Sequence, residues 1–117
     1  MDERLQRGVD AFNAGQFFTA HEIWEELWLE TVGPEKLLLQ GLVQIAAGYA
    51  KVESGLRGGA LKLLTRGSQS VRAFGPVAAG LVLADFVAGV TGDVERLRSA
   101  AEPVSLDIVR VPCLRET

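Results

Sequence analysis

The chain has 117 residues, which is the size of one ordinary domain and leaves no room for separate cofactor and substrate domains. A hydrophobic fraction of 48% is sufficient for a core, and a charged fraction of 23% is too low for a disordered chain. The formal net charge of −3 argues against nucleic acid or an anionic membrane surface as a partner. The N-terminus lacks a signal-peptide core, no apolar run approaches the roughly 18 residues of a membrane span, and Cys113 has no second cysteine to pair with. We therefore expect a cytoplasmic protein without a membrane segment.

Glycine residues and a capping pattern define the first two predicted helices. The first runs from about Asp2 to Ala14, with apolar residues at helical spacing and Gly15 directly after it. The second is expected to begin at Thr19, because Thr19 and Glu22 match the capping box S/T-x-x-E. It continues to about residue 31.

Three further helices and a tail complete the predicted fold. Residues 34–54 are apolar nearly all round, which is typical of a central, buried helix. A fourth helix is expected over about 57–74, and a fifth over about 83–101, either as one helix or as two pieces. Residues 103–117 are predicted to form an extended tail across the bundle, and no sheet is expected because no partner strand is evident. The prediction is one all-α domain over 1–117, a compact bundle of about five helices.

The second predicted helix places the only histidine at the border of its apolar stripe. That stripe consists of Ala20, Ile23, Trp24, Leu27 and Trp28. His21 lies at its edge beside Trp28, and Glu25 follows one helical turn later. A border position is partly desolvated yet reachable, so it suits a titrating or ligating pair.

The third predicted helix carries one polar stripe, formed by Gln40, Gln44 and Lys51, beside two glycines that would let another backbone approach closely. If the second and third helices pair as an antiparallel hairpin, His21 and Glu25 are expected near Lys51. The same pairing brings Gln44 close to Trp28.

These motifs resemble the domain of unknown function 309 family. The resemblance rests on the runs FNAGQFFTAHEIWEELW, LLLQGLVQIAAGY and GLRGGALKLL, and it covers about residues 9–74. It implies a small all-helical fold, and some proteins of this kind carry the label of metal-dependent hydrolases. The family positions present in this chain are His21, Glu22, Glu25, Trp28, Gln40 and Gln44. A further histidine that relatives often have near the end of the glutamine-containing helix is missing from the stretch 49–51.

Two functional hypotheses follow for His21 and Glu25. The first is a hydrolase-like site in which the two residues act as an acid–base pair or hold a divalent metal ion. Two protein ligands are fewer than the three of a catalytic zinc site, so this metal set is incomplete. The alternative is a non-catalytic helical module that binds a partner or a second copy of itself. In that case His21, Glu25 and the two glutamines form a structural polar network.

A ligand pocket is also predicted near His21. We expect Phe18, Trp24 and Trp28 to line it, and Gln40, Gln44 and Lys51 to complete its polar wall. A leucine on the outer side of the second helix, Leu29, indicates a surface for self-association. Basic residues on the fourth helix have no aromatic residues among them, which disfavours stacking on nucleic acid bases.

Overall fold

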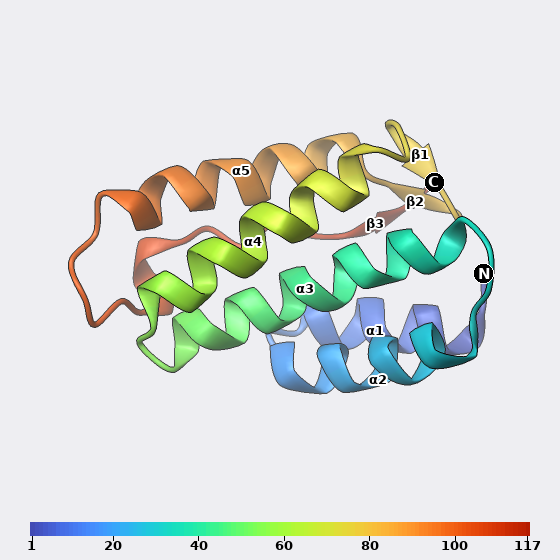
Figure 1. The fold of residues 1–117 in the computed structure, drawn as a ribbon, viewed down its shortest axis with the longest axis horizontal. Coiled ribbons are helices and arrows are strands. Elements are labelled where there is room, and N and C mark those ends of the chain that lie inside the picture. The colour runs from blue at the N-terminus through green and yellow to red at the C-terminus, as the bar shows by residue number, and fades with distance from the viewer.

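The computed structural model describes residues 1–117 and contains five helices, each packed against the next along the chain (Figure 1). Their bounds are α1 Glu3–Asn13, α2 Phe17–Glu30, α3 Glu35–Glu53, α4 Arg57–Arg72 and α5 Ala84–Arg98. The predicted all-α bundle is therefore confirmed, and the fifth helix is one continuous element. None of the five helices is both long and apolar enough to cross a membrane.

The start of α2 differs from the prediction. The helix begins at Phe17 after Gln16, and no side chain caps it, so the predicted capping box of Thr19 and Glu22 is wrong. Phe17 is buried, and its ring lies against Phe12 with centroids 5.3 Å apart. Burial of this ring in the core accounts for the earlier start, because tertiary packing outweighs the modest stabilisation from a cap.

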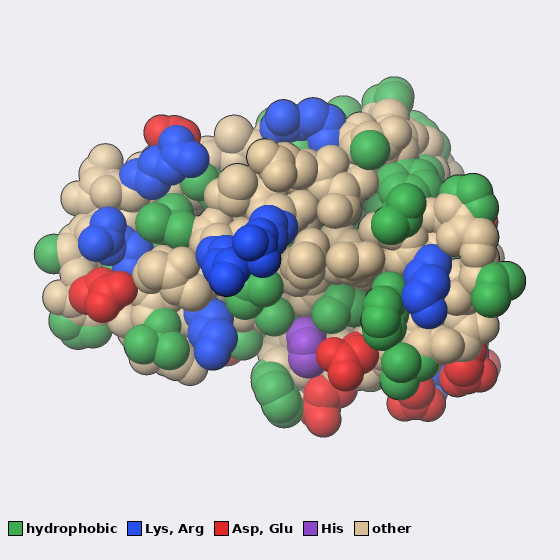
Figure 2. Space-filling view, viewed as in Figure 1, with side chains coloured by type: hydrophobic (Ala, Val, Ile, Leu, Met, Phe, Trp, Pro, Cys, Tyr) green, Lys and Arg blue, Asp and Glu red, His purple; other side chains and the backbone are tan.

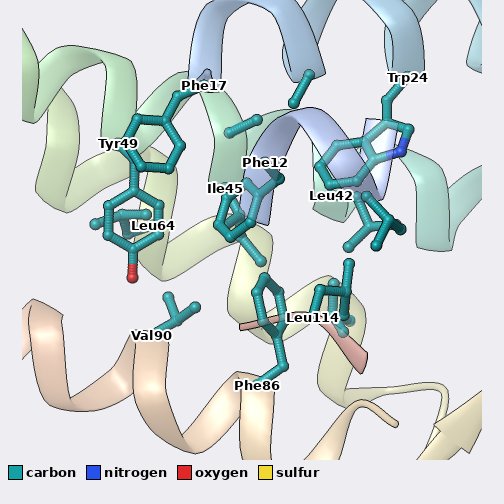
Figure 3. Packing of buried hydrophobic residues seen from close by; sticks show 14 of the residues in the cluster. Phe12, Phe17, Trp24, Leu42, Ile45, Tyr49, Leu64, Phe86, Val90 and Leu114 are labelled. Carbon is teal, nitrogen blue, oxygen red and sulfur yellow. The ribbon is translucent and has the colours of Figure 1, made fainter. Parts of the chain in front are cut away.

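The hydrophobic core is one cluster of buried residues with α3 at its centre (Figures 1 and 3). Phe12 of α1 contacts four aromatic rings within this cluster, with centroid distances between 5.3 and 5.9 Å. These rings belong to Phe17, Trp24, Tyr49 and Phe86. The aromatic residues thus join α1, α2, α3 and α5 into a single core.

The α3 and α4 backbones approach each other closely at glycine residues. A Cβ atom at Gly67 would lie 2.7 Å from the Gly41 carbonyl oxygen, and one at Gly48 would lie 2.7 Å from Leu64. The close approach expected for the glycines of the third helix is confirmed, and α4 is the helix that makes it.

The C-terminal tail crosses the bundle as expected, but it also completes a small sheet, so the prediction of no sheet is wrong. The strands are β1 Val77–Ala78, β2 Leu81–Val82 and β3 Arg115–Glu116, antiparallel in the order β1-β2-β3. The partner for the tail is a tight hairpin whose two turn residues, Ala79 and Gly80, both have positive φ. The short 3₁₀ helix η1 Leu106–Ile108 precedes β3.

Candidate functional site

His21 and Glu25 form a pair on the surface of α2, at the border position predicted for them. His21 Nε2 lies 3.2 Å from Glu25 Oε2, and the two side chains are 24% and 49% exposed. The Phe18 ring stacks on the imidazole with centroids 5.8 Å apart. In Figure 2 the histidine appears in purple next to acidic side chains. The pair is therefore reachable from solvent, and Phe18 covers one face of the imidazole.

A groove opens between α2 and α3 beside this pair. It has a volume of about 210 Å³ and is lined by Glu25, Trp28, Gln40, Val43 and Gln44. The predicted proximity of Gln44 to Trp28 is thus confirmed. Lys36 lies next to the groove, with its Nζ 4.2 Å from the centre of the Trp28 ring and donating to the Trp28 carbonyl oxygen. This lysine holds the indole in place from the solvent side.

Three buried polar atoms in this region have no hydrogen-bond partner. They are His21 Nδ1, Trp28 Nε1 and Gln44 Oε1, and the only other such side-chain atom is Arg57 Nε. A buried polar atom without a partner destabilises a fold by about 1–3 kcal/mol. Native structures contain few of them, and each calls for an explanation. Two of the three belong to residues that line the groove and the third to the adjacent His21, which marks the groove as the chain's leading candidate site.

Three residues expected in the ligand pocket do not line the groove: Phe18, which stacks on His21, and Trp24 and Lys51. Trp24 is fully buried on the α1 side, where its Nε1 donates to the Leu5 carbonyl oxygen at 3.2 Å. Its indole occupies the space beside Gly8, where a Cβ atom would come within 2.0 Å of it. Lys51 runs along the start of α4, 3.4 Å from a Cβ atom placed at Gly59. Trp24 therefore belongs to the core, and Lys51 lies beyond the groove.

The structural polar network expected around His21 is not closed. Glu25 contacts His21, but Gln44 Oε1 accepts no hydrogen bond. A network that serves only to fix helix register would have each buried member satisfied. The polar side chains of the groove therefore do not form a network in which every buried member has a hydrogen-bond partner.

The side chains around His21 do not form a complete metal site. Nowhere in the chain do three or more His, Cys, Asp or Glu side chains gather in a way that could hold a metal ion. His21 and Glu25 supply two donors, and the neighbouring indole and amide groups are not metal ligands of the kind that zinc sites use. Cys113 is exposed and lies near the C-terminus, beside Val82 of β2 and Asp85 at the start of α5. The residues present do not fit a catalytic metal.

A second polar cluster, which sequence reasoning missed, is buried between α3, α5 and the tail. The Tyr49 hydroxyl donates to Asp93 Oδ2 at 2.6 Å, and Asp93 Oδ1 accepts from Arg96 Nη1 at 2.9 Å and from the Arg110 backbone N–H at 2.8 Å. Asp93 is fully buried. Burial, followed by the charge of Asp93, raises the pKa of Tyr49 well above its ordinary value. The sequence does contain one indication of a buried carboxylate, because Asp93 lies three residues after Val90, on the apolar stripe of α5.

A larger cavity of about 360 Å³ lies at the end of the bundle near the N-terminus. Most of its lining residues are apolar, and they include Leu5, Leu27, Leu38 and Leu39. None of the unpartnered buried side-chain atoms belongs to it. The α2–α3 groove is therefore the better candidate despite its smaller volume.

Comparison with known proteins identifies one family. Residues 5–63 match the family model described as "Domain of unknown function (DUF309)". This segment spans α1, α2, α3 and the beginning of α4, so it contains every residue that lines the groove. Asp93 lies outside it. No curated protein matches the chain.

Proposed function

The chain belongs to the domain of unknown function 309 family, and we propose that its α2–α3 groove binds a small polar molecule. The observation that carries this proposal is the group of unpartnered buried atoms, two of which belong to groove-lining residues. A ligand that replaces the missing hydrogen bonds recovers free energy that the free protein lacks. The cytoplasmic location expected from the sequence is part of the same proposal.

The lining residues indicate what such a ligand carries. Trp28 Nε1–H requires an acceptor, and Gln44 Oε1 requires a donor. Glu25 adds a negative edge, while the Trp28 ring and Val43 supply apolar surface. A compact molecule with an acceptor next to an N–H or O–H donor, such as a primary amide or a urea, matches this set. Because both unpartnered atoms are covered by protein atoms, binding includes a rotation of the Gln44 side chain.

The two indole N–H groups allow a direct test by NMR. Small amides, ureas and diols are titrated while the indole N–H signals are followed. We expect the Trp28 signal to shift, because its hydrogen is unpaired, and the Trp24 signal to stay, because it is already bonded to Leu5. Gln44→Leu should abolish the shift, and Gln69→Leu, at an exposed glutamine of α4, should preserve it. If no compound shifts Trp28 selectively, the ligand proposal is rejected.

A second candidate is hydrolysis of the bound molecule, for which the pairing of His21 with Glu25 is the supporting observation. A carboxylate at 3.2 Å from Nε2 orients the imidazole and leaves Nδ1 as the proton acceptor. Because Nδ1 is buried, this candidate requires the ring to turn before Nδ1 can take a proton from an attacking water. The test is turnover of a panel of small amides and esters by the wild type and by His21→Gln. Loss of turnover in the variant supports this candidate, and absence of turnover in the wild type rejects it.

The metal-dependent form of this hypothesis has its own test. Zn²⁺, Mn²⁺ and Mg²⁺ are each added in thermal unfolding experiments on the wild type and on His21→Ala. A metal site would raise the unfolding temperature of the wild type alone. Equal behaviour of the two proteins removes the metal-dependent hydrolase from consideration.

A further inference from the structure

Between α2 and α4, α3 presents a stripe that is uncharged from Leu37 to Ala47 and ends in Lys51, whose side chain runs along the start of α4. The uncharged residues are the exposed Leu37 and Gln40 and the half-buried Gln44 and Ala47, separated by three, four and three positions. This is the spacing at which one helix presents residues to a neighbouring helix. Leu37 is 58% exposed, although it lies on the central helix of the bundle. We call these four residues the outer stripe.

Charges of opposite sign flank the outer stripe. On the α2 side lie Glu22 and Glu25, and on the α4 side lie Lys62 and Arg66, all of them exposed. Figure 2 shows both groups on one face of the molecule, with the acidic side chains near the histidine and the basic ones over α4.

The flanking charges are largely unused within the chain. Glu22, Lys62 and Arg66 take part in none of its salt bridges. By contrast, the glutamates on the other side of α2 pair with Arg4 of α1. Apart from the contact of Glu25 with His21, the face therefore has complementary acidic and basic borders that its own chain leaves unpaired.

We propose that a second copy of this chain docks on this face, with the two α3 helices packed parallel about a two-fold axis that runs along them. Such an axis exchanges the two sides of the face, so the glutamates of each copy meet the basic residues of the other. A two-fold axis across the helices would instead place glutamates against glutamates, and like charges in contact oppose association. The charge pattern thus selects both the partner and its orientation.

The positions of the charges along α3 agree with this arrangement. Glu25 lines the groove together with Gln40 and Gln44, while a Cβ atom at Gly67, next to Arg66, would lie 2.7 Å from Ile45. The acidic and basic residues therefore lie at similar positions along the α3 axis. In a parallel dimer, residues at the same position along α3 face each other across the two-fold axis.

The face lies on the broad side of the molecule. The molecule measures 38 × 24 × 21 Å, and Figure 2 looks down the shortest axis onto this face. Phe18 and Leu29 add exposed apolar surface on α2, at 63% and 66% exposure. Since Gln40 and Gln44 line the groove, the second copy would also close the groove from above.

Charge reversal with complementation tests this proposal independently of any ligand. One variant carries Glu22→Lys and Glu25→Lys, and the other carries Lys62→Glu and Arg66→Glu. Analytical ultracentrifugation at low salt should show a wild-type dimer and, for each variant alone, association weakened about tenfold or more. An equimolar mixture of the two variants should restore the dimer, which also shows that both are folded. A monomeric wild type, or a mixture that does not associate, overturns the proposal.

Cysteine cross-linking tests the orientation. In a Cys113→Ser background, Leu37→Cys and Ala47→Cys should each cross-link to the same residue of the second copy through a short thiol reagent. A parallel pair brings both positions next to their own counterparts, whereas an antiparallel pair can do so for one of them at most. Ser99→Cys, at an exposed position after α5, is the control and should not cross-link. Cross-linking at one position only, or at neither, overturns the parallel dimer.

Discussion

On its inner side α3 contributes Tyr49 to a cluster in which the phenol and both oxygens of Asp93 have partners. On its outer side it contributes Gln44 to a groove whose lining residues include two unpartnered buried atoms. Both clusters are polar, both join α3 to a neighbouring helix, and both are at least partly buried. The first is complete within the chain, as expected of a structural element. The second is complete only if another molecule supplies the missing bonds. Satisfaction of buried polar atoms, rather than their mere presence, therefore separates the scaffold from the candidate site.

The largest effect on stability that this comparison predicts is that of Asp93→Ala. Asp93→Ala leaves the Tyr49 hydroxyl, Arg96 and the Arg110 N–H without their acceptor, so we expect the free energy of unfolding to fall by about 3–5 kcal/mol. Urea denaturation measures this change. Asp85→Ala, an exposed aspartate on the same helix, should change it by less than about 1 kcal/mol. A fall of similar size in both variants would contradict a structural role for the cluster.

The pH dependence of stability gives the next largest effect. Because the pKa of Tyr49 is raised in the folded state, its contribution to stability is fully present below its ordinary value of 10.0 and is lost as the pH rises above it. We expect the free energy of unfolding to fall by up to about 1.4 kcal/mol per pH unit in that range.

Tyr49 is the only tyrosine, so the absorbance of the phenolate reports on this group alone. It should appear together with unfolding rather than before it. Tyr49→Phe should show a shallower decline in stability above pH 10 than the wild type. A phenolate signal in the folded protein near that pH would contradict burial of the hydroxyl.

A substitution in the groove should not lower the free energy of unfolding, in contrast to a substitution in the Asp93 cluster. Gln44→Leu removes an unpaired buried acceptor, so the free energy of unfolding should stay the same or rise by about 1 kcal/mol. Urea denaturation of this variant beside Gln69→Leu, at an exposed position, separates the groove from a general effect of added hydrophobicity. A loss above about 1 kcal/mol would mean that Gln44 is part of the scaffold.

The smallest effect is expected at His21. His21 forms a partly exposed pair with Glu25 and stacks against the Phe18 ring. Exposed pairs of this kind contribute about 0.3–0.5 kcal/mol to the free energy of unfolding. His21→Ala should therefore unfold within about 1 kcal/mol of the wild type. Thermal unfolding monitored by circular dichroism measures this, with Glu22→Ala as the neighbouring control. A strongly destabilised His21→Ala would place the histidine with the structural cluster instead.

Helical periodicity in the sequence was sufficient to predict the five helices and the border position of His21. Periodicity gives the direction of a side chain around its own helix, but it does not tell which neighbour the side chain meets. Trp24 lies on the predicted apolar stripe, yet it packs against α1, where Gly8 leaves room for the indole. Its assignment to the ligand pocket failed for this reason.

Long-range pairing accounts for the other differences. The partner strand of the tail is a hairpin more than thirty residues earlier in the chain, and two-residue strands leave almost no trace in a sequence. The sequence does not reveal the role of Asp93, because its partners come from three separate places, namely α3, its own helix and the backbone of the tail. Burial of Phe17, also a tertiary effect, displaced the predicted start of α2.

The connection between Asn13 and Leu114 has a consequence for the order of folding. The side chain of Asn13 donates to and accepts from the Leu114 backbone, both at 2.9 Å, across 101 positions of the chain. Each helix packs against the next, and such local contacts form early, whereas a loop of this length is closed late. During synthesis on the ribosome the helices can pair in the order in which they emerge. The contact between α1 and the tail, in contrast, can form only after Leu114 has left the ribosomal exit tunnel.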